Sequence, residues 1–162
     1  GMIGQYAHGN EPSHHVAYLY NYIKKPWKTQ KLVRDILETQ YKNKPNGHCG
    51  NEDCGQMSSW YVFSALGFYP VNPAQGIYVF GSPIIDAATI NLENGKTFTV
   101  KALNNNSENK YIQSITLDNE LIKRNYITHK EIIGGGELVF TMGNIPNKKT
   151  KNFMAPTSKM YQ

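Results

Sequence analysis

The sequence predicts an α+β protein in which a helical segment over residues 1–72 precedes a β-rich domain over residues 73–162. Apolar residues recur at helical spacing through the first 70 residues, and from Pro70 onward they alternate with a period of two. The β-rich half contains Asn94-Gly95, a strong hairpin signal between two alternating runs. A hydrophobic fraction of 40% is enough for a packed core and argues against global disorder.

The helical segment is expected to contain three helices. The first begins near Pro12, because proline is tolerated in a first turn, and its apolar stripe is Val16, Leu19, Tyr20 and Ile23. The second begins at Pro26 and ends before a break at residues 43–47. Its expected buried stripe is Val33, Ile36, Leu37 and Tyr41.

The third helix is expected over residues 56–66, where Gly67 and Pro70 end it. Its apolar residues, Trp60 and Phe63 among them, cover almost the whole circumference. Two short amphipathic helices cannot cover such a helix, so we expect self-association through an exposed helical face. A symmetric homodimer would be the simplest arrangement.

The β-rich half is expected to form a small antiparallel sandwich or sheet. Alternation and turn signals predict strands over 76–80, 88–92, 97–103, 111–117, 120–123 and 137–142. Asp118-Asn119 is expected to form a second hairpin turn, and Pro70 to Ala74 a linker. The polar tail after Pro146 is expected to be loose.

Charge and composition exclude several classes of function. The net charge of +5 comes from scattered lysines with no recognition-helix or RNA-binding signature, so we expect no nucleic-acid partner. No apolar run reaches the roughly 20 residues that span a membrane. Cys49 and Cys54 lack the further ligands of a zinc site, which leaves a local disulfide or two reduced thiols.

Acids and amides concentrate at two junctions between a loop and a helix, residues 8–15 and 48–56. Read alone, each junction is explained most simply by helix capping. Oxygen-rich clusters of this kind also suit Ca²⁺ or the hydroxyl groups of a sugar.

Three stretches resemble signature segments of glycoside hydrolase family 92. They run from Gly9 to Tyr22, which begins Gly-Asn-Glu-Pro-Ser-His-His, from Pro26 to Gln30, and from Gly50 to Pro70. The resemblance implies an inverting exo-α-mannosidase that acts on α-linked mannosides, α-1,2 linkages foremost. It also implies an (α/α)₆ catalytic barrel with a β-sandwich, a bound Ca²⁺ and a secreted or periplasmic parent protein.

The motif match also implies roles for single residues. It makes Asp53 the candidate general base, and Asn51, an amide that cannot take the proton, a residue that orients water or helps at the metal. The candidate metal ligands are Glu11, Asn10 and Asp53. The candidate contacts to substrate, a mannose-containing glycan, are His14, His15, Glu52 and Gln56.

One departure from the family pattern weakens the enzymatic prediction. The family's general acid lies in a Glu-Gly-Asn-Ser-Trp-like segment upstream of the first motif, and this sequence contains no such segment. About three helices are expected where the barrel needs twelve. We therefore expect a C-terminal piece that is inactive alone. The alternatives are a carbohydrate- or calcium-binding module, or an interaction module that docks through its exposed helical face.

Overall fold

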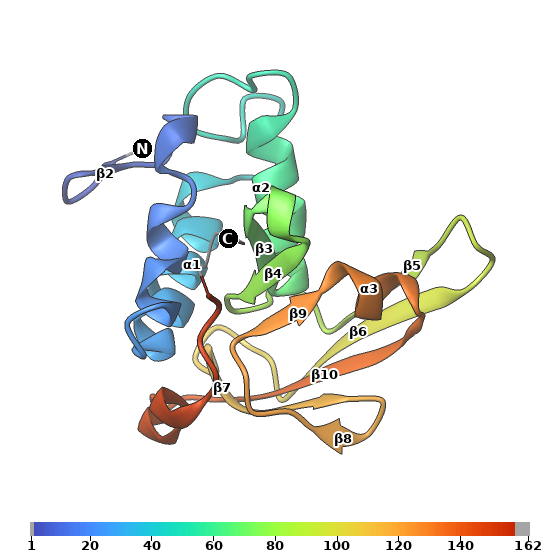
Figure 1. The fold of residues 1–162 in the computed structure, drawn as a ribbon. Coiled ribbons are helices and arrows are strands. Elements are labelled where there is room, and N and C mark those ends of the chain that lie inside the picture. Colours follow the sequence, from blue (N-terminus) through green and yellow to red (C-terminus); the bar gives the residue numbers. More distant parts are fainter. Residues whose placement is uncertain (1, 158–162) are drawn as a thin grey trace, which may run out of the picture.

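The computed structural model describes residues 2–157 and has a mixed α+β fold (Figure 1). Its α-helices are α1 (Pro26–Gln40), α2 (Gln56–Leu66) and α3 (His129–Ile133). Its 3₁₀ helices are η1 (Glu11–Ser13), η2 (Val16–Asn21), η3 (Pro73–Gln75) and η4 (Lys148–Asn152). Its strands are β1 (Met2–Ile3), β2 (Tyr6–Ala7), β3 (Phe68–Asn72), β4 (Ile77–Phe80), β5 (Ala87–Asn91), β6 (Thr97–Leu103), β7 (Tyr111–Leu117), β8 (Glu120–Leu121), β9 (Tyr126–Thr128) and β10 (Gly136–Gly143).

The two long helices confirm the sequence prediction. Helix α1 begins at Pro26, and α2 spans the predicted residues 56–66. Gly67 ends α2 in a left-handed conformation with φ of 98°, and its N–H donates to the carbonyls of Phe63 and Ser64. Local signals were sufficient here because proline and glycine act on the backbone itself.

The prediction of a first α-helix was wrong. The segment folds as two 3₁₀ helices, η1 and η2, and its buried residues include Ala17 and Tyr18. Three residues of the predicted apolar stripe are instead exposed: Val16 by 39%, Leu19 by 41% and Ile23 by 58%. A 3₁₀ helix has three residues per turn, so the face that it buries differs from that of an α-helix.

The strands form three sheets. The five-stranded sheet has the order β5-β6-β10-β7-β8, the three-stranded sheet has the order β3-β4-β9, and β1 pairs with β2. Strand β10 runs parallel to β6, which corrects the expectation of purely antiparallel pairing. The expected hairpins are present, with Asp118 and Asn119 both at positive φ between β7 and β8.

Strands β3 and β9 and helix α3 were not predicted. The expected linker is largely strand β3, where the register shifts between Tyr69 and Asn72, on either side of Pro70. Strand β3 pairs with β4 across the expected boundary at residue 72, so the two-domain division stays a prediction. Helix α3 was also missed, although Thr128 and Glu131 form a reciprocal capping box at its start.

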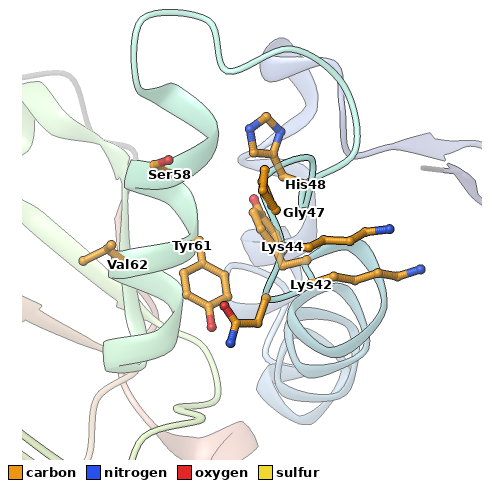
Figure 2. Close-up of a pocket in the computed structure, with 10 residues that line it drawn as sticks. Lys42, Lys44, Gly47, His48, Ser58, Tyr61 and Val62 are labelled. Atoms are coloured by element: carbon orange, nitrogen blue, oxygen red, sulfur yellow. The ribbon is translucent and has the colours of Figure 1, made fainter.

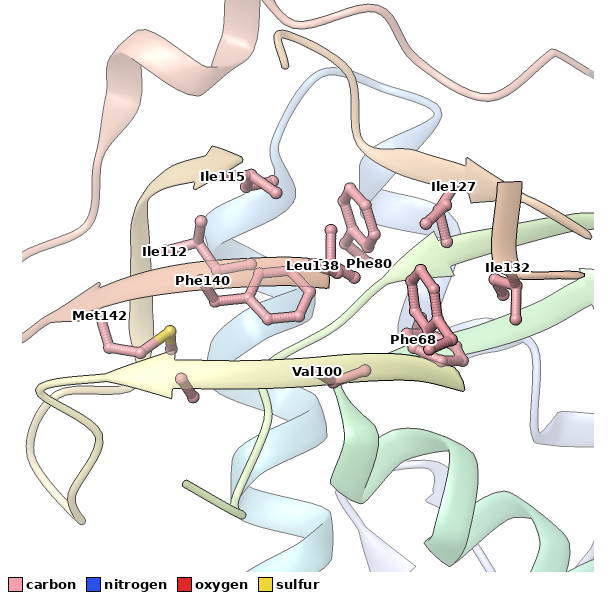
Figure 3. Packing of buried hydrophobic residues seen from close by; sticks show 12 residues of the cluster. Phe68, Phe80, Val100, Ile112, Ile115, Ile127, Ile132, Leu138, Phe140 and Met142 are labelled. Carbon is pink, nitrogen blue, oxygen red and sulfur yellow. The ribbon is translucent and has the colours of Figure 1, made fainter. Parts of the chain in front are cut away.

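The larger core lies between the two main sheets (Figure 3). Phe80 of β4 meets Phe140 of β10 edge to face at 5.3 Å between ring centroids. A second core joins α1, α2 and η2 around Trp60, which is fully buried by this chain. The expectation that Trp60 needs an outside partner was therefore wrong, because η2 and β3 supply its neighbours Tyr18 and Tyr69.

The two halves are also joined by a buried arginine and by the tail. The guanidinium of Arg34 on α1 donates to the carbonyls of Asn106 and Pro83 and to the side chains of Asn105 and Ser82. The tail after Pro146 is structured rather than loose up to residue 157. Thr150 in η4 is buried, and Met154 pairs with Arg124.

Candidate active site

The two junctions predicted to carry the chemistry lie against each other at a pair of glycines. A Cβ atom added to Gly50 would lie 2.7 Å from Cα of Gly9 and 2.9 Å from its carbonyl oxygen. No side chain fits at that distance, and Gly50 also has a positive φ of 88°. The loop before α2 therefore touches the backbone at Gly9, just before η1, and the blue and teal segments lie next to each other in Figure 1.

This contact brings together the carboxyl groups of Glu11 and Asp53. A hydrogen bond between the two raises the pKa of Asp53 and lowers the pKa of Glu11. The Oε1 atom of Glu11 is buried and has no hydrogen-bond partner. Two facing carboxylates and an unpaired buried oxygen favour a cation once both groups are ionised.

Asp53 lies in a strained turn that leads into α2. Asp53, Cys54 and Gly55 have φ values of 47°, 55° and 90°, so three successive residues are left-handed. Such conformations are unfavourable for residues with a Cβ and tend to be retained at functional sites.

Helix capping explains only part of the two junctions. The side chain of Asn10 makes no cap hydrogen bond to η1, and the N-cap of α2 is Gly55, which has no side chain. Glu52 does accept a hydrogen bond from the N–H of Ser58 in the first turn of α2, at 3.0 Å. Asn10, Asn51 and Asp53 are exposed, so their side chains can reach a ligand.

His14 is buried and held in one tautomer. Its Nε2 lies 2.9 Å from the carbonyl oxygen of His8, so this nitrogen carries the proton. Its Nδ1 accepts from the amide of Gln56 at 3.1 Å, and the same amide donates to the hydroxyl of Tyr69 at 3.1 Å. Burial lowers the pKa of His14, which keeps the ring neutral.

A histidine that sequence reasoning missed supports this arrangement. His8 is fully buried, and its ring stacks on that of His14 at 4.8 Å. Its Nδ1 lies 2.8 Å from the hydroxyl of Tyr6, and its Nε2 lies 2.6 Å from the hydroxyl of Tyr41. Burial lowers the pKa of His8 to about 3, so the ring is neutral. No sequence signal separates the buried His8 from the exposed His15.

Four of the predicted site residues line one pocket of about 370 Å³, namely Glu11, His14, His15 and Gln56. Its other wall is apolar and includes Phe63, Tyr69 and Pro73. A pocket with polar groups on one wall and aromatic residues on the other suits a pyranose ring. Asn10, Asn51, Glu52 and Asp53 are not among the residues that line this pocket.

A second pocket of about 440 Å³ lies between the loop after α1 and another face of α2 (Figure 2). Tyr61, Val62 and Ser58 form its α2 wall, and Lys42 and Lys44 point their amines away from Tyr61. None of the predicted site residues lines it.

Residues 2–157 contain neither a disulfide, nor a metal-binding cluster, nor a membrane-spanning helix. Both cysteines are free thiols, so the local disulfide is not formed. No group of three or more His, Cys, Asp and Glu side chains is arranged around a possible metal position in this part of the chain. Within the same residues, no helix combines the length and the apolar character that a bilayer crossing requires.

Comparison with known proteins assigns this chain to a family. The sequence profile of the glycosyl hydrolase family 92 catalytic domain matches residues 1–144. A family 92 α-mannosidase of Bacteroides thetaiotaomicron, solved in complex with mannoimidazole, is 45% identical with a TM-score of 0.93. This alignment covers 96% of the present chain and 21% of that enzyme.

Two further relatives agree with this placement. A family 92 inverting mannosidase of the same bacterium is 46% identical over 92% of this chain and 20% of its own, with a TM-score of 0.86. An uncharacterized secreted glycosidase of Arthroderma benhamiae is 37% identical over 83% of this chain and 18% of its own length. The chain thus spans about a fifth of the relatives it matches. This chain belongs to glycosyl hydrolase family 92 and corresponds to part of its catalytic domain.

Proposed function

We propose that this chain is the C-terminal part of an inverting exo-α-mannosidase and supplies the general base and part of a calcium site. The observation that carries the proposal is the contact at Gly9 and Gly50, which places the carboxyl groups of Glu11 and Asp53 together. Similarity to α-mannosidases of the same family supports mannosides as the substrate. We take α-1,2 linkages as the first candidates.

Asp53 is proposed to take a proton from the attacking water. In an inverting glycosidase, a carboxylate activates water on the face of the sugar ring opposite the leaving group. The exposed side chain of Asp53 can reach a water molecule, and its carboxylate oxygens can accept the proton. Asn51, two residues before Asp53, would orient the water through its amide.

The donor set fits Ca²⁺, although it is incomplete within this chain. Glu11, Asn10 and Asp53 are proposed to hold the ion, because carboxylate and amide oxygens are its preferred ligands. The unpaired buried oxygen of Glu11 supports this, since a cation would satisfy it. When bound, the ion would supply positive charge to orient the sugar hydroxyls.

The sugar itself is proposed to contact the 370 Å³ pocket. His14 is neutral and fixed, Gln56 is held between His14 and Tyr69, and His15 is exposed at the rim. Glu52, also predicted as a substrate contact, has both of its oxygens bound by Ser58 and His48.

Catalysis needs an acid that this sequence does not contain, so we expect the chain alone not to hydrolyse mannosides. General acid catalysis contributes roughly 10²–10⁴ in rate. We place the parent protein outside the cytoplasm, as a secreted or periplasmic enzyme, because one relative is described as secreted. We further expect self-association through exposed apolar residues such as Ile23 and Val62, which are 58% and 55% exposed.

The proposal is tested by calorimetric titration of the purified chain with mannoimidazole at saturating Ca²⁺. We expect weak binding that Glu11→Gln and Asp53→Asn abolish and that Glu137→Gln, in a surface ion pair on β10, leaves unchanged. Absence of binding by the unaltered chain, or equal binding by all three variants, would contradict it. Release of mannose from α-mannobiose would contradict the expected inactivity.

A further inference from the structure

Both carboxylate oxygens of Glu52 have partners within this chain. Its Oε1 accepts from the N–H of Ser58 at 3.0 Å, and its Oε2 accepts from the hydroxyl of Ser58 at 2.9 Å. Nε2 of His48 lies 3.0 Å from the same Oε2. Glu52 therefore connects the loop before the turn, through His48, to the first turn of α2, through Ser58.

The turn between these two contacts does not hold its shape by local preference. Asp53 and Cys54 both carry a Cβ and both have φ near 50°. In this region the Cβ approaches the following carbonyl oxygen, so an unrestrained chain would leave it. Two backbone hydrogen bonds close the turn: the carbonyl of Asp53 accepts from the N–H of Gln56 at 3.1 Å, and the carbonyl of Glu52 accepts from the N–H of Met57 at 3.3 Å. Both run from the turn to α2, so only the side chain of Glu52 also connects the turn to the loop at His48.

We infer that Glu52 is a positioning residue, which acts through His48 and Ser58 to hold the left-handed turn that places Asp53 against Glu11. The inference rests on the proposed function for the importance of Asp53. The conformation of the turn does not depend on that function, because the contacts of Glu52 and the φ values are present without any ligand. It gives Glu52 a different role from the substrate contact expected from the sequence.

Ordinary helix capping by Glu52 is the simpler alternative, but it explains fewer of the observed contacts. A cap requires only the hydrogen bond from the N–H of Ser58. It explains neither the contact with His48 nor the two successive left-handed residues that follow Glu52. A cap also predicts a different result on substitution, because its loss would loosen the first turn of α2 and leave residues 53 and 54 unchanged.

Glu52→Gln separates these readings while keeping the size of the side chain. The glutamine oxygen can still accept from the N–H of Ser58, but its NH₂ group can only donate. The substitution therefore removes the negative charge and the acceptor beside His48 and the Ser58 hydroxyl, and both groups can meet the NH₂ group only by acting as acceptors themselves. The measurement is the NMR cross-peak between the amide and α protons within Asp53 and within Cys54. This cross-peak is strong in left-handed backbone, where the two protons are close.

We expect strong cross-peaks in the unaltered protein and a loss of at least about half their intensity in Glu52→Gln, as the turn leaves the left-handed region. Adding Cys54→Gly to Glu52→Gln should restore the cross-peak at Asp53, because glycine adopts positive φ without cost from a Cβ. The matched control is Glu137→Gln, which removes a carboxylate paired with Lys101 and should change neither signal.

His48→Ala provides a second route if Glu52→Gln fails to fold, since it leaves both contacts with Ser58 in place. It should weaken the same two cross-peaks while the amide protection of α2 is retained. Unchanged signals at Asp53 and Cys54 in the folded variants would overturn the inference. Failure of the chain to bind calcium or sugar would overturn the proposed function and leave these signals readable.

Discussion

The backbone contact between the two motif loops can be tested by Gly50→Ala. The added Cβ would meet Cα of Gly9 at 2.7 Å, well inside ordinary van der Waals contact, and both contacting atoms are backbone. Relief requires the loops to separate, and overpacking of this kind costs about 1–3 kcal/mol. The positive φ of Gly50 adds about 1–2 kcal/mol for a residue with a Cβ. The expected loss of unfolding free energy is therefore about 2–5 kcal/mol.

Gly95→Ala is the matched control for the conformational part of this cost. Gly95 has a φ of 79°, close to the 88° of Gly50, and an added Cβ there meets nothing within 4 Å. It should lose only about 1–2 kcal/mol. For a chain of this size each kcal/mol lowers Tm by roughly 2–4 °C, so the two variants should differ clearly.

Urea unfolding followed by circular dichroism and by tryptophan fluorescence measures both free energies. Gly50→Ala should be the less stable variant by about 1–3 kcal/mol. Equal losses, within about 0.5 kcal/mol, would refute the close approach of Gly9 and Gly50. Greater loss in Gly95→Ala would refute it more strongly.

Two further predictions concern the buried polar groups. Arg34→Met should lower the free energy of unfolding by about 3 kcal/mol, because four acceptors of the β-rich half lose their donor. Lys31→Met, at an exposed residue of the same helix, should lower it by less than about 1 kcal/mol. Equal losses in thermal unfolding would contradict this. The free energy of unfolding should fall as the pH is lowered from about 6.5 toward 3, because His8 takes up a proton in the unfolded chain but stays neutral in the folded one. His8 should contribute a slope of up to about 1.36 kcal/mol per pH unit. In His8→Gln the urea midpoint of unfolding should depend less on pH across this range. His129→Gln, at an exposed histidine, should keep the pH dependence of the unaltered chain. The same pH dependence in both variants would count against a neutral buried His8.

The parts of the fold that sequence reasoning predicted are those fixed by local chemistry. Pro26 and Gly67 set the ends of the two long helices, and alternation with turn signals located most strands. Strand β3 was missed because Pro70 was interpreted as a break, whereas pairing with β4 decides its conformation. The parallel pairing of β10 with β6 is non-local and leaves no signal in a single strand.

The candidate site shows the same division. The motifs identified Glu11 and Asp53, but only the folded chain shows that Gly9 and Gly50 bring them together. The buried network around His8 carries no signal in the sequence, because its burial depends on Tyr41 and Trp60 from elsewhere in the chain. The wrong assignment of residues 16–23 as an α-helix has a similar origin, since helical spacing alone cannot tell which face is covered.

Calcium binding by the purified chain, measured by isothermal titration calorimetry, is the decisive test of the proposed site at Glu11 and Asp53. We expect that the unaltered chain binds Ca²⁺, that Glu11→Gln and Asp53→Asn each abolish the binding, and that Glu137→Gln retains it. Binding should also weaken on acidification, because the raised pKa of Asp53 lets protons compete with the ion. A chain that binds no calcium, or that binds it equally well without Glu11 and Asp53, would contradict a calcium site at these residues.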